Sequence, residues 1–373
     1  MVCVNRAEVY IVQLPLKSKF KHAITTRLSS DSIFVKLVLS DGTTGYGEAL
    51  PREYVTGETP ASVLDALEAI ISKSILGRGV DDYRGVAGLV DAAGIAGGAA
   101  RCALELALLD AYGRHFGASV SAITGRAGRR DFVYSGVIQA DSVKDAIKKS
   151  LAFRVYGLRF VKVKVGSGDD LARLSAVRAV MGARADIRVD ANCAWSADEA
   201  IERMGRMRRF GISAVEQPVK ADDHNGLKKV TDAVTEKVIA DESLCTVADA
   251  ERLAGQRACG IFNIRISKCG GIMNSLRIAD IARRNGIGLQ IGCQVGESGL
   301  LSAAGWHLIN ALGDVVFCEG AYGRYLLKDD VTKEDITIRR GGTIRPIDGP
   351  GLGVNVLEDA LKRYTTAKRA IGS

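Results

Sequence analysis

The sequence predicts an α/β protein, a (β/α)8-type TIM barrel preceded by an N-terminal α+β capping domain. From about Phe132 the chain alternates short apolar runs with helical segments, at about 26 residues per unit. Before that point two strand-like segments are followed by helices, which is the order of a small α+β domain. The open doubly wound sheet is the alternative. It requires a glycine-rich phosphate loop after its first strand, and SGVIQADS, residues 135–142, is not such a loop.

The capping domain is predicted over residues 1–128. Residues 7–16 and 32–40 have the composition of strands, and the turn signal Asp41-Gly42 leads into TTGYGEA, residues 43–49. Thr59 followed by Pro60 predicts the start of a helix over 60–75, and a second helix is expected over about 97–113. The C-terminal segment, 321–373, is expected to return to this domain.

The barrel is predicted over residues 129–320. Its eight strands are expected at 132–138, 160–165, 186–192, 213–218, 237–242, 261–268, 287–293 and 315–320. Helices are expected between them, and Ser196 with Glu199 has the spacing of a capping box at the start of one such helix. Repeated strand–helix units of this length favour a closed ring.

The composition favours a small-molecule enzyme over a nucleic-acid-binding protein. The chain has 373 residues and a formal charge of +8, without a long Lys/Arg block or an aromatic-rich basic segment. An anionic small substrate fits this charge equally well. The most apolar stretch, residues 95–112, contains Arg101, Glu105 and Asp110, which indicates a buried helix rather than a membrane span.

The cysteines favour a reducing compartment. The chain has eight of them without CxxC or histidine spacing, which disfavours a zinc site. The first residues, MVCVNRAEVY, lack a signal-peptide pattern. We therefore expect reduced thiols and a cytoplasmic protein.

Ionisable residues stand near the ends of five consecutive predicted barrel strands. They are Lys162 and Lys164, then Asp190 beside Asn192, then Glu216, then Asp241 and Glu242, and then Lys268. From Lys164 to Lys268, one such residue recurs every 25 to 27 residues, in register with the barrel repeat. Each residue alone has a structural explanation: a carboxylate can cap a turn or hold an arginine, and a lysine can extend to solvent. Together they are expected to surround one mouth of the barrel.

Three converging carboxylates repel one another unless a cation lies among them. Oxygen ligands of this kind suit Mg²⁺ or Mn²⁺ rather than zinc. Lys164 and Lys268 belong to strands four apart in a ring of eight, so they are expected to face each other across the mouth. Crowding by the metal and a second ammonium should favour the neutral amine that a lysine base requires. The metal would hold a substrate carboxylate and stabilise the enediolate, and two opposed bases would give 1,1-proton transfer.

The motifs KVK, VDAN, EQP, ADES and SKCGG resemble those of the enolase superfamily and, within it, the muconate-lactonizing-enzyme subgroup. The resemblance covers nearly the whole chain. It implies that Asp190, Glu216 and Asp241 are Mg²⁺ ligands and that Lys164 and Lys268 are the acid/base pair. It also implies that Lys162 supports Lys164 and the substrate carboxylate, and that loops of the capping domain select the substrate.

Within this subgroup, GYGEALPREYVTGET, residues 45–59, is most similar to dipeptide epimerases. These enzymes usually present Asp-x-Asp on strand 8 to bind the substrate ammonium, whereas this chain has FCEG with Glu319 alone. Arg27 and Arg52 could favour an additional anionic group on the substrate, or they could be solvated loop arginines. The candidate substrate-binding residues are Arg27, Arg52, Thr56, Asn192, Glu297 and Glu319.

The first hypothesis is therefore Mg²⁺-dependent epimerisation or racemisation of an amino-acid derivative, with a dipeptide as the first candidate. A muconate cycloisomerase or an o-succinylbenzoate synthase-like lyase could use the same residues. A Schiff-base aldolase with Lys268 as the covalent amine leaves the carboxylates unexplained, and a non-catalytic binding protein leaves the whole constellation unexplained. The expected partner is a small carboxylate substrate, without nucleic acid or membrane, and the chain is expected to form a homo-oligomer.

Overall fold

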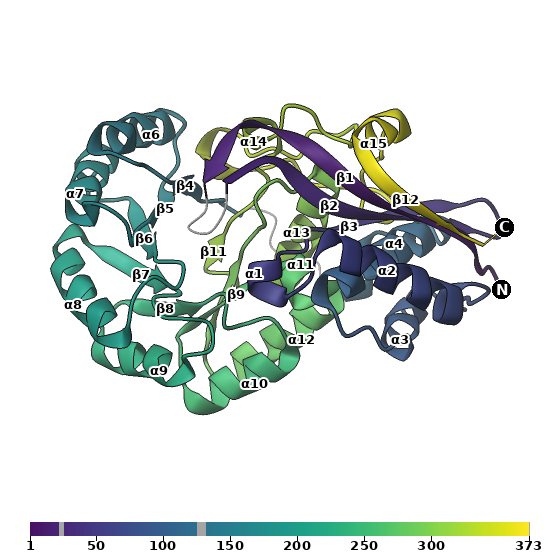
Figure 1. Ribbon diagram of the computed structural model, residues 1–373, viewed down its shortest axis with the longest axis horizontal. Helices are drawn as coiled ribbons and strands as arrows, with labels where there is room; N and C mark the ends of the chain where they lie inside the picture. The colour runs from purple at the N-terminus through teal and green to yellow at the C-terminus, as the bar shows by residue number, and fades with distance from the viewer. Residues whose placement is uncertain (22–25, 125–131, 373) are drawn as a thin grey trace.

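A computed structural model describes residues 1–21, 26–124 and 132–372 and arranges them in two parts (Figure 1). One part is an eight-stranded parallel sheet in the order β11-β10-β9-β8-β7-β6-β5-β4, curled inside a ring of helices. The other is a four-stranded antiparallel sheet in the order β12-β1-β2-β3, with helices on one side. The predicted fold class is confirmed.

The barrel strands follow the predicted order. They are β4 (Gly136–Ile138), β5 (Phe160–Lys164), β6 (Asp186–Asp190), β7 (Ile212–Glu216), β8 (Lys237–Ala240), β9 (Ile261–Ile264), β10 (Gly288–Ile291) and β11 (Phe317–Cys318). Lys164 lies opposite Asp190, and Asp190 lies opposite Glu216, in the register of three adjacent strands. Among the described residues, one bridge between Tyr134 and Cys318 closes the ring, so the seam between β4 and β11 has the fewest ladder contacts.

Helices connect the strands and form the outer ring of Figure 1. They are α6 (Val143–Val155), α7 (Asp170–Met181), α8 (Ala197–Met207), α9 (His224–Ala233), α10 (Val247–Gln256), α12 (Gly271–Arg284) and α13 (Gly299–Leu312). The predicted capping box at Ser196 and Glu199 is confirmed at the start of α8. After β11 the chain forms α14 (Gly323–Leu326) and then crosses to the capping domain.

One predicted strand is wrong at its C-terminal end. Residues 261–268 were expected to be a single strand, but β9 ends at Ile264 and the short helix α11 (Ile266–Cys269) follows. Gly270 and Gly271 both adopt positive φ, which ends α11 and starts α12 in a conformation that side chains other than glycine rarely take. Lys268 therefore lies on α11, beyond the strand to which the sequence assigns it.

The capping domain consists of β1 (Val4–Lys21), β2 (Thr26–Leu39), β3 (Thr44–Ala49), α1 (Glu53–Thr56), α2 (Pro60–Ile70), α3 (Gly85–Ala92), α4 (Gly98–His115) and α5 (Val120–Thr124). The helix expected over 60–75 is α2 continued by a π-helical turn, Ile71–Ile75. The C-terminal segment forms α15 (Glu358–Tyr364) and β12 (Thr365–Ile371), and β12 pairs with β1.

The glycines of GYGEA allow α4 to pack closely on β3. A Cβ on Gly47 would lie 2.0 Å from the Ala103 carbonyl oxygen, and one on Gly45 would lie 2.1 Å from the Ala111 nitrogen. The helix that fits against these glycines is almost completely buried. Close helix–sheet packing is thus encoded by the absence of side chains at two alternate positions of one strand.

Two buried glutamates join the capping domain to the barrel. Glu48 accepts hydrogen bonds from the backbone nitrogens of Ser298 and Leu301 at the start of α13, each at 3.1 Å. Glu105 accepts one from the Met273 nitrogen, 3.1 Å away, at the start of α12. Carboxylates are favourable at helix N-termini, where unpaired N–H groups and the helix dipole carry positive charge. In the described part of the chain, no helix is both long and apolar enough to cross a lipid bilayer.

Candidate active site

The barrel interior is apolar farther from the mouth and polar toward the C-terminal ends of the strands. Ala214, Ile239, Ile261 and Phe317 form a separate buried cluster, with Phe160 packed against it. Further along the strands follows a buried polar layer made of Lys162, Arg188, Glu216, Asn263, Gln290 and Glu319, each at most 5% exposed. Alternation along the strands brings these residues inward, so the polar layer is the floor of the barrel mouth.

The three predicted carboxylates are buried, and cationic side chains hold all of them. Asp190 accepts a hydrogen bond from Lys164 Nζ at 2.7 Å, and Lys162 Nζ lies 3.2 Å from the same carboxylate oxygen. Glu216 accepts from Lys162 Nζ at 3.0 Å. Asp241 accepts from Lys268 Nζ at 2.8 Å. The five strands from β5 to β9 and the segments directly after them therefore bring these carboxylates and lysines to one mouth, as the 26-residue spacing indicates.

Burial and mutual charge shift the pKa values of these groups. Burial raises the pKa of Glu216, and the neighbouring Lys162 ammonium offsets only part of this effect. Burial opposes ionisation of Asp190 as well, but Lys164 and Lys162 hold its pKa well below the usual range. Burial alone would lower the pKa of Lys162, yet the carboxylates of Glu216, Glu319 and Asp190 raise it well above its usual value. The floor of the mouth is thus a network of compensating charges.

Lys268 Nζ faces oxygen atoms: the Asp241 carboxylate and carbonyl, and the Asn263 carbonyl. Burial would lower the pKa of Lys268, but the Asp241 carboxylate more than offsets this and raises it. The neutral amine that we expect from crowding by the metal and a second ammonium stays a prediction for the Mg²⁺-loaded site.

The two lysines proposed as bases have different access to the mouth. Lys164 is on β5 and Lys268 follows β9, which lies four strands away in the sheet order. The Lys164 side chain is 22% exposed, and its Nζ also donates to Asn192 Oδ1 at 2.6 Å. The Lys268 side chain is 0% exposed. The mouth is thus open on the Lys164 side and closed on the Lys268 side.

The donor set of the three carboxylates fits Mg²⁺. Within the described residues, no group of three or more His, Cys, Asp or Glu side chains surrounds one common position as the side chains stand. The guanidinium of Arg265 forms an ion pair with Asp241 and lies 3.6 Å from Glu216, while Lys162 bridges Glu216 and Asp190. Cations thus lie between the carboxylates already, and the carboxylates offer only oxygen atoms, which Mg²⁺ prefers as ligands.

The sequence reasoning did not identify two arginines and a glutamine near the floor of the mouth. Arg265 pairs with Asp241, and the fully buried Arg188 donates to Glu319 Oε1 at 2.7 Å. Gln217 accepts from the Asp241 nitrogen through its Oε1 at 2.9 Å and so fixes the start of the β8–α10 loop. Arg188 precedes Asp190 by two residues, the strand period, and this signal could have identified it as inward-facing.

The candidate substrate-binding residues do not all reach the mouth. Asn192 lies there, linking Lys164 to Glu242 Oε1, which its Nδ2 contacts at 3.2 Å. Both Glu319 oxygens are engaged, one by Lys162 Nζ and one by Arg188 Nη2, each at 2.7 Å. Glu297 accepts from the Gln294 nitrogen at 2.5 Å, and burial raises its pKa to about 8.

The two loop arginines and Thr56 complete this set. Arg52 is buried and donates to the carbonyls of Pro51 at 2.9 Å and Val295 at 3.0 Å, so it is not a solvated loop arginine. Thr56 is at the end of α1, with its hydroxyl 3.5 Å from the Arg52 carbonyl. The side chain of Arg27 lies outside the described residues.

Unusual backbone conformations occur where the strands end at this mouth. Asn192, Cys193, Gln217 and Ala321 are non-glycine residues with φ between 35° and 64°. They follow β6, β7 and β11. Such conformations cost free energy and persist where the surrounding structure holds them, commonly at functional sites.

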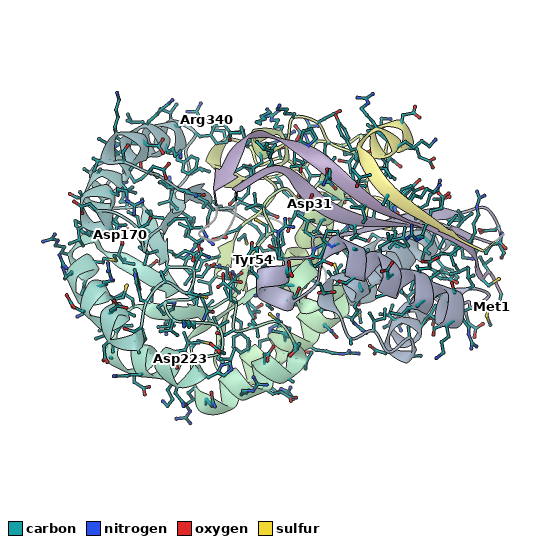
Figure 2. The ribbon with its side chains drawn as sticks, viewed as in Figure 1. Met1, Asp31, Tyr54, Asp170, Asp223 and Arg340 are labelled. Atoms are coloured by element: carbon teal, nitrogen blue, oxygen red, sulfur yellow. The ribbon has the colours of Figure 1, made fainter. Side chains whose placement is uncertain are left out.

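A cavity of about 380 Å³ opens at this mouth, within the size range of small-molecule sites. Lys162, Lys164, Asn192, Arg265 and Glu319 line it from the barrel, and Arg52 and Tyr54 line it from the capping domain. Figure 2 labels Tyr54, which is on α1, the short helix between the barrel ring and the capping sheet. The cavity therefore joins both domains, and Lys268 is not among its lining residues.

Comparison with known proteins agrees with this arrangement. Residues 6–125 match the family model described as mandelate racemase / muconate lactonizing enzyme, N-terminal domain, and residues 145–360 match enolase C-terminal domain-like. The chain belongs to the mandelate racemase/muconate lactonizing enzyme family of the enolase superfamily. Members of this family with epimerase and racemase activity identify the chain as an enzyme of the isomerase type.

Several members are similar over nearly their full length. The L-Ala-D/L-Glu epimerase of Clostridium acetobutylicum is 32% identical over 92% of this chain and 96% of its own. Muconate cycloisomerase 1 of Rhodococcus opacus is 28% identical over 96% of this chain and 97% of its own.

Two solved structures share the fold. The N-succinyl Arg/Lys racemase from Bacillus cereus has a TM-score of 0.92 at 25% identity and covers 99% of this chain and 100% of its own. The dipeptide epimerase from Cytophaga hutchinsonii, complexed with Mg and the dipeptide D-Ala-L-Val, has a TM-score of 0.89 at 26% identity with the same coverage.

Proposed function

We propose that the chain is an Mg²⁺-dependent epimerase or racemase that inverts the Cα of an amino-acid derivative, with a dipeptide as the first substrate to test. The order of charged residues around the barrel carries this proposal. Lys164, Asp190 and Glu216 end three consecutive strands, Asp241 directly follows β8, and Lys268 lies on α11 after β9. A substrate carboxylate held near the central carboxylates would have one lysine on each side of its Cα.

The two lysines would move the proton. The neutral amine of one lysine removes the proton from Cα, and the ammonium of the other delivers a proton to the opposite face. Reaction in the reverse direction exchanges the two roles. Lys162, which Glu216 and Glu319 hold in its charged form, would attract the substrate carboxylate.

Asp190, Glu216 and Asp241 are the residues that would hold Mg²⁺. When bound, this ion supplies positive charge beside the substrate carboxylate, where negative charge develops as the proton leaves. The Cytophaga epimerase structure, which contains Mg and a dipeptide, supports this choice of cofactor.

A cycloisomerase or an o-succinylbenzoate synthase-like lyase is the second candidate, favoured by the strand-8 residue. Glu319 stands alone there and is bound to Lys162 and Arg188, so it offers less to a substrate ammonium than two free carboxylates would. In such an enzyme one lysine transfers the proton and the other only stabilises charge.

Deuterium incorporation distinguishes these functions. A library of dipeptides and N-acylamino acids is incubated with the Mg²⁺-loaded enzyme in D₂O, and Cα exchange and configuration are followed by NMR and chiral chromatography. Exchange with inversion is the expected result. A cyclised or dehydrated product without exchange of the substrate would instead support the second candidate. Borohydride trapping of substrate on Lys268 would support an aldolase.

Cytoplasmic location and a homo-oligomeric state remain predictions. Fractionation of the cells that produce the protein tests the first, and light scattering of the purified protein tests the second.

A further inference from the structure

The cavity at the barrel mouth has two chemically different ends. Lys162, Lys164 and Arg265 give its inner end a cationic character. Its outer end, here named the seam pocket, extends between α6 and the segment after β11. It is lined by Phe153, Tyr156, Leu158, Tyr325, Leu326 and Ile338.

The weak closure of the barrel creates the seam pocket. β4 has three residues and β11 has two, and one bridge between Tyr134 and Cys318 joins them. Gly136 contributes as well, because a Cβ there would lie 2.5 Å from the Phe153 ring and 2.8 Å from a Leu158 methyl group. The missing side chain lets apolar residues approach the strand beside the mouth.

The side chains that line the seam pocket are uncharged, and the nearby Arg324 guanidinium lies against the Tyr325 ring, 5.8 Å from its centroid. The rings of Tyr156 and Tyr325 pack edge to face with centroids 5.9 Å apart. Their hydroxyls contact each other, and that of Tyr156 also donates to the Ile338 carbonyl at 3.2 Å. A ligand group in this pocket would therefore meet ring faces and aliphatic side chains, and its burial would be stabilised by the hydrophobic effect.

The nearest carboxylate would not attract a cationic group. Glu319 lines the cavity, but Lys162 and Arg188 engage both of its oxygens. A substrate ammonium here would have to break a buried ion pair, which is costly. The charges thus fit a carboxylate at the inner end, and the walls fit an uncharged apolar group at the outer end.

We propose that the seam pocket is a specificity subsite that binds an uncharged apolar group of the carboxylate substrate, either an N-acyl chain or a large apolar side chain. The proposal rests on the proposed function, and it adds a selecting element outside the loops of the capping domain. Its walls are α6 and the segment after β11.

Binding of N-acylamino-acid probes tests the subsite without relying on epimerisation. Calorimetric titration of the Mg²⁺-loaded enzyme compares N-acetylglycine with N-hexanoylglycine, and N-acetylphenylalanine tests the side-chain route. Each buried methylene should tighten binding roughly fourfold, so N-hexanoylglycine is expected to bind at least about tenfold more tightly than N-acetylglycine. A preference for N-acetylphenylalanine instead assigns the pocket to the side chain. Equal affinities for all three probes would overturn the proposal.

A matched pair of variants locates the effect. Leu326→Trp fills the seam pocket, whereas Leu151→Trp adds the same side chain at a position on α6 that is 48% exposed and does not line the cavity. Leu326→Trp should abolish the advantage of the larger probe, and Leu151→Trp should retain it. If both variants retain it, the apolar group binds elsewhere and the proposal is wrong.

Leu326→Ala keeps the test valid if the tryptophan variant does not fold. It enlarges the pocket and should shift the preference toward N-octanoylglycine relative to the wild type. An unchanged preference would contradict the subsite. Failure of the proposed function has a different signature: the binding preference persists, and none of the substrates exchanges its Cα proton in D₂O.

Discussion

The open and closed sides of the barrel mouth use the same type of residue in opposite environments. On the open side, Lys164 lines the cavity and contacts Asp190 and Asn192. On the closed side, Lys268 is fully buried and faces Asp241 and the carbonyl of Asn263. The proposed proton transfer between two faces of a substrate would thus use one accessible and one enclosed lysine.

The capping domain produces this difference. The Leu50 nitrogen donates to Ser267 Oγ at 2.9 Å, and Ser267 Oγ lies 3.2 Å from the Leu50 carbonyl. At the start of α4, a Cβ on Gly98 would lie only 2.4 Å from the Lys268 carbonyl oxygen. The segment carrying Lys268 is therefore held between the domains, whereas the Lys164 side chain on β5 is 22% exposed among the described residues. The difference predicts that changes on the closed side cost stability as well as activity.

The largest effect is expected from Asp241→Asn, which removes charge from the closed side. The variant loses a proposed Mg²⁺ ligand and the partner of Lys268, so Mg²⁺-dependent Cα exchange should fall by about 10⁴-fold. Exchange is measured by NMR and Mg²⁺ affinity by calorimetry. Asp232→Asn, on the exposed surface of α9, is the matched control. Retained Mg²⁺ affinity with full exchange would remove Asp241 from the site.

Lys164→Ala and Lys268→Ala should both abolish inversion, by about 10³-fold, since each removes one acid/base group. Their stabilities should differ. Lys268→Ala leaves the buried Asp241 carboxylate without its ammonium and should cost about 3 kcal/mol of unfolding free energy. Lys164→Ala, on the partly exposed side, should cost about 1 kcal/mol. Urea denaturation measures both values, and equal losses would contradict the distinction between the two sides.

Ser267→Ala tests the hydrogen bonds between Leu50 of the capping domain and Ser267 beside Lys268. It removes the hydrogen bonds to Leu50 and should destabilise the protein by about 1 kcal/mol. It should also slow proton transfer on the Lys268 side by several-fold and leave exchange on the Lys164 side unchanged. Ser275→Ala is a suitable control, because Ser275 is equally buried but bonds to the Gly271 carbonyl within α12. Equal slowing of proton transfer on both sides would mean that these hydrogen bonds do not act through Lys268.

The smallest effect concerns His307, which lies on α13 away from both lysines. Burial lowers the pKa of His307 to about 4, while the Leu352 carbonyl near Nε2 acts in the opposite direction. Because the unfolded chain binds a proton near pH 6.5, the stability that the neutral imidazole contributes is present above that pH. It is lost as the pH falls toward 4, by up to about 3 kcal/mol. Urea denaturation from pH 7 to 4 should show a smaller fall for His307→Gln than for the wild type. If the unfolding free energies of the two proteins fall in parallel from pH 7 to 4, His307 is not the source of this pH dependence.

The sequence predicts which strand ends carry the site residues better than it predicts how their side chains pack. Asp190, Glu216 and Asp241 could be located because the barrel repeat sets their spacing, and alternation along each strand orients them. Lys268 was assigned to a strand because its apolar neighbours continue the strand pattern, whereas the two following glycines allow a helical turn. Local periodicity does not distinguish these alternatives.

Interactions between distant segments could not be predicted in the same way. The sequence allows Arg52 to be a solvated loop arginine, but a contact with Val295 buries it. Arg265 and Lys268 owe their environments to Asp241, on the neighbouring strand end. The seam pocket joins Phe153 to Ile338. Such pairings depend on the twist and closure of the barrel, which no short sequence pattern encodes.

The central claim is that Lys164 and Lys268 act on opposite faces of one substrate carbon. Cα exchange in D₂O of each enantiomer, measured separately with Lys164→Ala and Lys268→Ala, tests it most directly. The account predicts that each variant still exchanges the proton of one enantiomer without inverting it, and that the two variants retain opposite enantiomers. If both variants exchange the same enantiomer, or both lose exchange of both enantiomers equally, the two lysines do not form a two-sided acid/base pair.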